Sequence, residues 1–162
     1  MSNGMRKHRM TTENVTARPE DQVRRRMLEW KETFEAKDVE GMMAFYAPEG
    51  FTGFDLMPPL EFRGGEMWRR NWIGFLGAFE GSPGLEFRDL QVFASGDLSF
   101  VRTFTRIFGT MGGSPIDMWV RQTNCFRLVD GEWLMIHDHV SVPADLATGR
   151  ALTELAPAGA PR

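Results

Sequence analysis

Residues 119–143 read WVRQTNCFRLVDGEWLMIHDHVSVP, and this stretch decides the fold. The pair Asp130-Gly131 at its centre is a strong signal for a two-residue hairpin turn. The turn joins two predicted strands, over residues 116–129 and 132–142, and Pro143 stops the second. The folded part of the chain is therefore expected to end in an antiparallel pair of strands.

The residues before this hairpin predict two further strands. They span residues 85–94 and 98–108, with a Ser-Gly-Asp turn at 95–97 between them and a glycine-rich connection at 111–115 after them. The four consecutive strands are expected to follow one another as a meander.

Helical patterns occupy the first half of the chain. Residues 19–36 form the first predicted helix, because a proline suits its first turn and apolar residues follow at helical spacing. Those apolar residues are Val23, Met27, Trp30 and Phe34. Asp38 caps a second short helix that ends near Tyr46, and a third helix is predicted over residues 66–79. A short extended segment, residues 51–56, lies between them.

This order of elements predicts an α+β fold, in which an antiparallel sheet collects the helices on one face. A strongly curved sheet of this kind wraps around the helices and leaves a cavity between the two layers. Alternating positions along each strand then divide into residues that line the cavity and residues on the outside.

Length and composition exclude several classes of protein. With 162 residues the chain is expected to form one domain, and 42% hydrophobic and 25% charged residues are ordinary for a globular protein. A net charge of -3 argues against a dedicated nucleic-acid-binding protein, and the single cysteine, Cys125, excludes an internal disulfide. No apolar run approaches the roughly 20 residues that cross a bilayer. The 13 Phe, 5 Trp and 11 Met residues suit a wide apolar interior.

The two ends of the chain differ from the part between them. Residues 1–18 are basic and lack apolar periodicity, so we expect a disordered tail there, and residues 158–162 are expected to fray. The domain is expected to span residues 19–157. No apolar stretch follows the basic start, so the prediction is a cytoplasmic protein, with a mitochondrial presequence as the weaker alternative.

The last predicted strand carries two of the three histidines, His137 and His139. With a period of two, their side chains share one face of the strand with those of Trp133, Met135 and Ser141. The two histidines are either satisfied polar residues of a sheet or proton carriers in the wall of a pocket.

Asp55 is an acid in the otherwise apolar segment 54–57. It either caps the turn before Pro58 or is held in an apolar pocket with a raised pKa, which suits a general base. Metal binding is a weaker hypothesis, because two imidazoles need a third and usually a fourth ligand. Only carboxylates such as Asp55, or His8 in the tail, are available.

Arginines alternate with aromatic residues on the two middle strands. Phe104 is flanked on its face by Arg102 and Arg106, and Trp119 shares a face with Arg121 on the next strand. These faces are either exposed and held by cross-strand pairs, or they form a polar patch in an aromatic pocket that polarises a carbonyl. We favour the pocket, because Arg121 and the histidines lie on faces that each begin with a tryptophan.

Several segments carry a resemblance to a known family. The most specific is residues 119–143, and the others are residues 55–60, the helix with Trp72 and the ending 148–152. Over about three quarters of its length the chain resembles the nuclear transport factor 2-like superfamily, in its SnoaL-like or ketosteroid-isomerase-like branch. The resemblance implies a cone-shaped α+β fold with a curved antiparallel sheet wrapped around three N-terminal helices, an apolar cavity, and commonly a homodimer joined through the sheet.

The resemblance also implies a chemistry, because its better-understood members perform cofactor-free acid–base reactions on bulky apolar molecules. Asp55 matches the region of the base in ketosteroid isomerases, but their tyrosine-based oxyanion hole is absent, since the only tyrosine is Tyr46. In SnoaL-type cyclases an acid on a late strand takes the proton, and this chain offers His137 and His139 in that neighbourhood.

We therefore expect a cofactor-independent acid–base enzyme, of isomerase, cyclase or lyase type, that acts on a small or medium apolar carbonyl compound. The expected catalytic residues are His139, His137, Asp55 and Arg121. The residues expected to bind the ligand are Trp72, Trp119, Phe104, Arg102, Arg106 and Tyr46. The alternative is a non-catalytic ligand-binding or dimeric association domain. No metal, cofactor, nucleic acid or membrane is expected as a partner.

Overall fold

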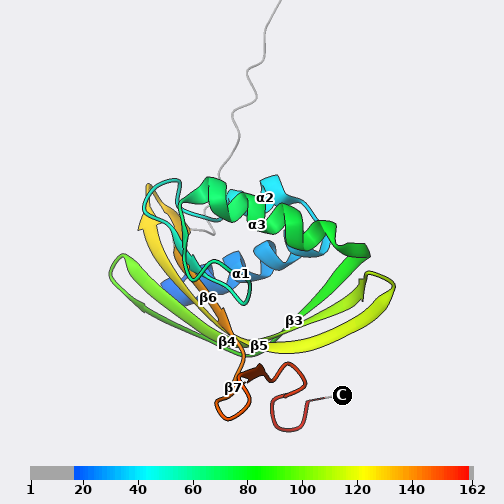
Figure 1. Cartoon of the computed structure of the whole chain (residues 1–162). Helices are drawn as coiled ribbons and strands as arrows, with labels where there is room; N and C mark the ends of the chain where they lie inside the picture. Colours follow the sequence, from blue (N-terminus) through cyan, green and yellow to red (C-terminus); the bar gives the residue numbers. More distant parts are fainter. Residues whose placement is uncertain (1–16, 161–162) are drawn as a thin grey trace, which may run out of the picture.

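The computed structural model describes residues 17–160. Residues 1–16, which make up most of the predicted tail, and residues 161–162 lie outside this described part. Within it, three helices lie on the concave side of a curved sheet (Figure 1). This arrangement confirms the predicted α+β fold with a curved sheet around N-terminal helices.

The three helices follow the apolar spacing of the sequence. Helix α1 (Pro19–Glu35) starts at its proline, and the Asp38 carboxylate caps α2 (Val39–Met43) by accepting a hydrogen bond from the Gly41 N–H at 2.9 Å. Helix α3 is Gly65–Gly77. The residues that α1 and α3 bury are Val23, Met27, Trp30, Phe34, Trp68, Trp72 and Leu76. These side chains form the helix side of the apolar core.

Six strands form the main sheet, in the order β2-β1-β6-β5-β4-β3. Their bounds are β1 (Thr52–Phe54), β2 (Phe62–Arg63), β3 (Phe79–Ser95), β4 (Leu98–Met111), β5 (Ser114–Val129) and β6 (Glu132–Ser141). Neighbouring strands are antiparallel except β1 and β6, which are parallel. The short strands β7 (Ala144–Asp145) and β8 (Arg150–Ala151) pair separately.

The first long strand begins earlier than the sequence pattern indicates. Strand β3 starts at Phe79 rather than at residue 85, and its pairing with β4 shifts between Glu80 and Gly84. Gly84 lies against the ring of Phe108, where a Cβ atom would be only 2.2 Å from the ring. Gly84 therefore permits a close contact inside the sheet.

One extra residue in β6 reverses the predicted faces of that strand. Cys125 pairs with His137 but the next residue, Phe126, pairs with Met135, so Ile136 forms a bulge. Trp133 and Met135 point inward, as the period of two predicts, but after the bulge the inward residues are Asp138 and Val140. His137 and His139 lie on the outer face, so the prediction that they share the face of Trp133 is wrong.

The arginines of β4 and β5 also lie on the outer face, so the prediction that they point into the cavity under the helices is wrong. Arg102 and Arg121 instead line an open hollow on the outer face together with Phe104. Arg106 pairs with Asp117 at 2.7 Å and Glu86 at 3.2 Å, and Arg102 donates to Gln91. The alternative of an exposed face with cross-strand pairs is therefore the observed one. Burying an unpaired guanidinium inside the cone would be very costly.

The two aromatic residues predicted to join those arginines are on the outer face too. Phe104 is exposed, whereas Trp119 is buried under the C-terminal segment and lines a groove with Leu155 and Pro157. In Figure 1 this segment lies beyond β7, on the side of the sheet away from the helices. Trp119, the first residue of its strand face, therefore lies on the covered outer surface of the sheet and not in the cavity.

Candidate functional site

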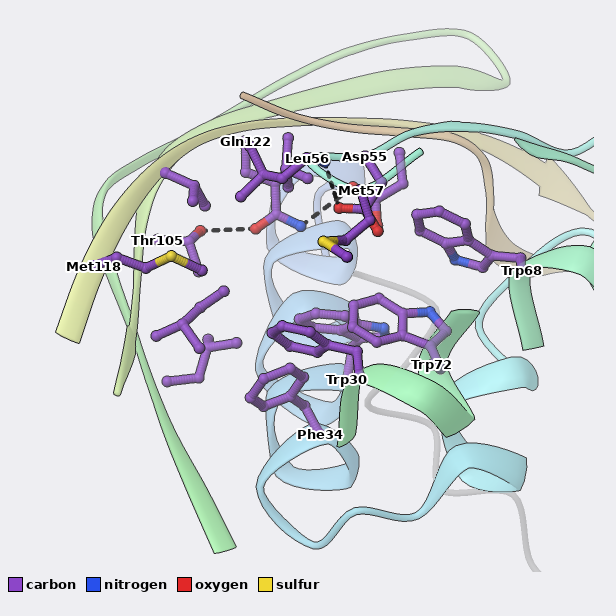
Figure 2. Close-up of a pocket in the computed structure, with 16 residues that line it drawn as sticks. Trp30, Phe34, Asp55, Leu56, Met57, Trp68, Trp72, Thr105, Met118 and Gln122 are labelled. Atoms are coloured by element: carbon purple, nitrogen blue, oxygen red, sulfur yellow. Dashed lines mark hydrogen bonds between the residues drawn. The ribbon is translucent and has the colours of Figure 1, made fainter. Parts of the chain in front are cut away.

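An apolar cavity of about 90 Å³ lies between the helices and the concave face of the sheet (Figure 2). Its lining residues are Trp30, Phe34, Asp55, Leu56, Met57, Trp68, Trp72, Phe75, Leu85, Thr105, Ile107, Met118, Val120, Gln122, Asp138 and Val140. This lining contains two carboxylates and no lysine, arginine or histidine. Because a cavity holds a water molecule at about 10–15 Å³, this one has room for a small organic molecule.

The Asp138 carboxyl group is deeply buried in the wall of this cavity, with 2% of the residue exposed. The Gln122 Nε2 donates to Asp138 Oδ1 at 3.3 Å, and the Tyr46 hydroxyl donates to Oδ2 at 3.4 Å. Gln122 is itself oriented by the Thr105 hydroxyl, which donates to its Oε1 at 2.7 Å. Figure 2 shows this row of bonds from Thr105 through Gln122 across the cavity wall.

The burial of Asp138 changes its protonation. Loss of water around the carboxyl group raises its pKa to about 7, and the charge of Asp55 acts in the same direction. The hydrogen bonds that Gln122, Tyr46 and Asn124 donate act in the opposite direction. A carboxyl group with such a pKa is partly protonated near neutral pH, so it can both accept and donate a proton.

Tyr46 lies behind Asp138 and supports it. The Trp30 Nε1 donates to the Tyr46 hydroxyl at 3.0 Å, and that hydroxyl donates onward to Asp138. Burial raises the pKa of Tyr46 well above its usual value of 10, and the Asp138 charge raises it further. Tyr46 therefore remains a hydrogen-bond donor at neutral pH, although it is absent from the residues that line the cavity.

Trp68 and Trp72, four residues apart on α3, form the wall opposite the sheet. Their ring centroids are 5.5 Å apart at an interplanar angle of 78°. Gly53 makes room for Trp68, because a Cβ atom at that position would lie 2.6 Å from the indole ring. Trp72 was predicted to contact a ligand, and it does line the cavity.

Asp55 lies at the mouth of the cavity, in the loop that follows β1. Its Oδ1 accepts a hydrogen bond from the Leu56 N–H at 2.6 Å, and its Oδ2 accepts one from the Asn71 side chain. Asp55 therefore stabilises the local turn, as the first interpretation holds, and the residue also lines the cavity. Leu56 and Met57 beside it are partly exposed.

The predicted histidines lie on the other side of the sheet, at the edge formed by β1 and β6. His137 shares a hydrogen bond of 2.8 Å with the Thr52 hydroxyl, and the Phe54 ring contacts both imidazoles edge-on. Desolvation is the main cause that lowers the pKa of His137. Neither imidazole reaches the cavity.

The other predicted groups do not gather at the cavity either. Arg121 donates to the Ser141 hydroxyl at 3.1 Å on the outer face. In residues 17–160, no group of three or more His, Cys, Asp or Glu side chains is placed to hold a metal ion. His8, a candidate third ligand, lies outside the described residues.

Asp138 and Gln122 were not predicted from the sequence as site residues. Asp138 lies between the two histidines, and the period of two placed it with Leu134, Ile136 and Val140. An acid among apolar residues was the signal that singled out Asp55, and the same signal was present here. A buried carboxyl group among apolar side chains is a better candidate than an exposed imidazole, because its environment shifts its pKa into the working range.

Comparisons with known proteins agree with this architecture. The model of the SnoaL-like domain family matches residues 23–145. No curated protein matches the chain in sequence. No helix within residues 17–160 is long and apolar enough to span a membrane.

Solved structures share the fold over most of the chain. An NTF2-like protein of unknown function from Pseudomonas putida is 29% identical, covers 85% of this chain and 96% of its own, and superposes with a TM-score of 0.78. A proposed dehydratase of the NTF2-like family from Streptomyces avermitilis is 20% identical over 75% of this chain and 94% of its own (TM-score 0.68). The association domain of CaMKII from C. elegans is 16% identical over 75% and 94% (TM-score 0.62). The last two likenesses show the fold alone.

Proposed function

Because the chain belongs to the SnoaL-like domain family and has the NTF2-like cone fold, we propose that it is a cofactor-independent acid–base enzyme with Asp138 as its proton carrier. The substrate of this proposal is a small, neutral and mainly apolar carbonyl compound, and the reaction is of isomerase, cyclase or lyase type. The observation that carries the proposal is a buried carboxyl group, with a pKa of about 7, in the wall of an apolar cavity.

The chemistry follows from the protonation of Asp138. In its ionised form the carboxylate removes a proton from the carbon next to the carbonyl group, and in its protonated form it returns the proton to another atom of the same molecule. Tyr46 and Gln122 hold the carboxyl group in place through their hydrogen bonds. Asp55 lies where the cavity meets solvent, and it disfavours a negatively charged ligand.

The proposal is tested by proton exchange in D₂O. We expect the protein to exchange the α-protons of at least one compound in a panel of neutral cyclic ketones, enones and β-hydroxy ketones faster than buffer does. Mass spectrometry of the recovered compound measures the incorporated deuterium. Saturable binding of panel members with no exchange and no product would contradict catalysis and favour the alternative, a non-catalytic ligand-binding domain.

We also propose that the protein forms a homodimer through the outer face of the sheet. Phe93, Phe100 and Phe104 are 44%, 43% and 37% exposed there, and the first two rings stack at 4.7 Å. Exposed aromatic clusters of this kind are typical of interaction surfaces. The existence of association domains with the same fold supports self-association.

Sedimentation equilibrium tests the dimer. The wild-type protein is expected at twice the chain mass, and Phe100→Glu at the chain mass, because it places a charge in the proposed contact. The control Ile73→Glu adds the same charge at a residue that is 54% exposed on α3, on the opposite side of the sheet, and it should remain dimeric. A wild-type protein at the chain mass would refute the dimer.

A further inference from the structure

Three buried polar side chains form a row across three neighbouring strands on the concave face of the sheet. They are Thr105 of β4, Gln122 of β5 and Asp138 of β6, each at most 4% exposed, and all three line the cavity. The Thr105 hydroxyl donates to Gln122 Oε1 at 2.7 Å, and Gln122 Nε2 donates to Asp138 Oδ1 at 3.3 Å (Figure 2). The proposed proton carrier therefore has a second partner behind the first.

The two oxygen atoms of the Asp138 carboxyl group differ in how firmly their partners are oriented. Oδ2 faces the Tyr46 hydroxyl, which accepts a hydrogen bond from the Trp30 indole and donates one to Asp138. An indole N–H can only donate, so the direction of these two bonds is fixed. Oδ1 faces the amide of Gln122. An amide has an acceptor oxygen and a donor nitrogen in nearly equivalent positions, so half a turn would exchange them.

The Thr105 hydroxyl decides between the two orientations of the Gln122 amide. Its bond to Oε1 leaves the amide nitrogen directed at Asp138. In the reversed orientation Oε1 would face Oδ1 of the ionised carboxylate with no proton between them. The hydroxyl proton would also lose its acceptor, because it has no other side-chain or backbone acceptor within residues 17–160. A buried polar group without a partner costs about 1–3 kcal/mol, so the hydroxyl stabilises the observed orientation.

We infer that Thr105 is a positioning residue of the candidate site: its hydroxyl keeps an N–H group of Gln122 directed at Asp138 and so stabilises the ionised carboxylate, the form that takes up a proton. The hydrogen bond from Gln122 opposes the rise in the pKa of Asp138 that burial causes, so its loss is expected to raise that pKa further. This inference rests on the proposed function and adds to it a residue that acts through Gln122.

The other groups around Asp138 are the same with and without the Thr105 hydroxyl. Asp55, in the loop after β1, raises the pKa of Asp138 through its charge, and Tyr46, which follows α2, donates a hydrogen bond. On β5, the Cys125 thiol is affected by the charge of Asp138. Helices α1 and α3 contribute only uncharged side chains to the cavity lining. A change in Asp138 on removal of the hydroxyl therefore reports on Gln122.

The first test is Thr105→Val, because valine has nearly the shape of threonine but lacks the hydroxyl. In a ¹³C NMR titration, the midpoint of the Asp138 carboxyl signal is expected to rise by about one pH unit relative to wild type, the equivalent of one hydrogen bond. The matched control is Thr103→Val. Thr103 is a buried threonine of the same strand whose hydroxyl donates to the carbonyl groups of Arg88 and Phe104. An unchanged midpoint in Thr105→Val, or an equal shift in Thr103→Val, would overturn the inference.

A second pair of variants keeps the test decisive if Thr105→Val does not fold. Thr105→Ser keeps the hydroxyl and Thr105→Ala removes it, whereas both lack the methyl group. The serine variant should titrate near the wild-type midpoint, and the alanine variant should show the raised midpoint. Equal midpoints in these two variants would contradict the positioning role of Thr105.

The pH dependence of proton exchange separates positioning from a general loss of structure. Exchange by an ionised base rises with pH to a plateau, and its midpoint reports the pKa of that base. A midpoint one unit higher makes Thr105→Val or Thr105→Ala about tenfold slower than wild type near pH 6, whereas near pH 9 the rates should be nearly equal. A rate lowered by the same factor at every pH would contradict the inference.

The two proposals fail in different ways. If the Asp138 midpoint moves as expected but no compound is exchanged or converted, the positioning of Gln122 by Thr105 stands and the proposed enzyme does not. If a compound is exchanged with the same midpoint and pH profile in wild type and in the Thr105 variants, the enzyme stands and the positioning role does not.

Discussion

Asp138→Asn is expected to lower proton exchange on any compound that the wild-type protein exchanges by about 10²–10⁴-fold, the range found when a general base is removed. The amide cannot take up the proton, but it has nearly the same size and can still accept the hydrogen bond from Gln122 or Tyr46. Binding of the compound should therefore change much less than its exchange rate. The measurement is the rate of deuterium incorporation at saturating compound.

The matched control for this variant is Asp130→Asn. Asp130 lies in the exposed β5–β6 turn with a positive φ of 49°, a conformation that asparagine tolerates well. The Asp130→Asn substitution removes a carboxylate at a distance from the cavity, so this variant should exchange the protons of the compound at the wild-type rate. If Asp138→Asn also keeps the wild-type rate, Asp138 is not the proton carrier, and Asp55 becomes the carboxylate to test.

The stability of the protein is expected to fall between pH 4 and pH 7 because of Asp138. Its pKa is 3.8 in the unfolded chain and about 7 in the folded protein, so over this range only the folded form holds the proton. The contribution of Asp138 to the free energy of unfolding is fully present below pH 3.8 and is lost as the pH rises through 7. At about 1.36 kcal/mol per pH unit, the loss is on the order of 4 kcal/mol.

A comparison of Asp138→Asn with the wild type isolates this effect. Other groups also titrate: the pKa values of Asp117 and Asp145 are lowered, and their contributions are lost as the pH falls. The contributions of these groups are the same in variant and wild type, so they cancel in the difference between the two free energies of unfolding. Urea unfolding should show the variant gaining stability relative to wild type from pH 4 to pH 8. A difference that does not change with pH would contradict the buried, protonated carboxyl group.

Local patterns were sufficient to predict the helices, the long strands and the hairpin. The stripe from Val23 to Phe34 and the Asp130-Gly131 turn depend only on residues close in sequence, so they could be seen there. The faces of β6 depend on a distant segment. Met135 exchanges backbone hydrogen bonds of 2.8 Å with Phe45 and Ala47, and Thr52 pairs with His137. Ile136 falls between these two neighbours, and periodicity alone cannot indicate the bulge.

The residues of the candidate site were predicted only in part. A proton carrier on the last strand, Trp72 in the wall and Asp55 near the cavity were expected, and the structure places Trp72 and Asp55 in the lining. The bulge exchanges the histidines for Asp138 as the inward group. Arg121 was predicted to point inward because it shares a strand face with Trp119. That face is outside, and the C-terminal segment that covers Trp119 is remote in sequence.

The central claim is that Asp138 holds a proton near neutral pH inside the cavity. A ¹³C NMR titration of the aspartate carboxyl carbons tests it most directly, with the Asp138 signal identified by its absence from Asp138→Asn. We expect a midpoint near pH 7 for this signal. A midpoint near the ordinary aspartate value of 3.8 would mean that Asp138 is ionised throughout the working range, and it would contradict the proposed role of Asp138 as proton carrier.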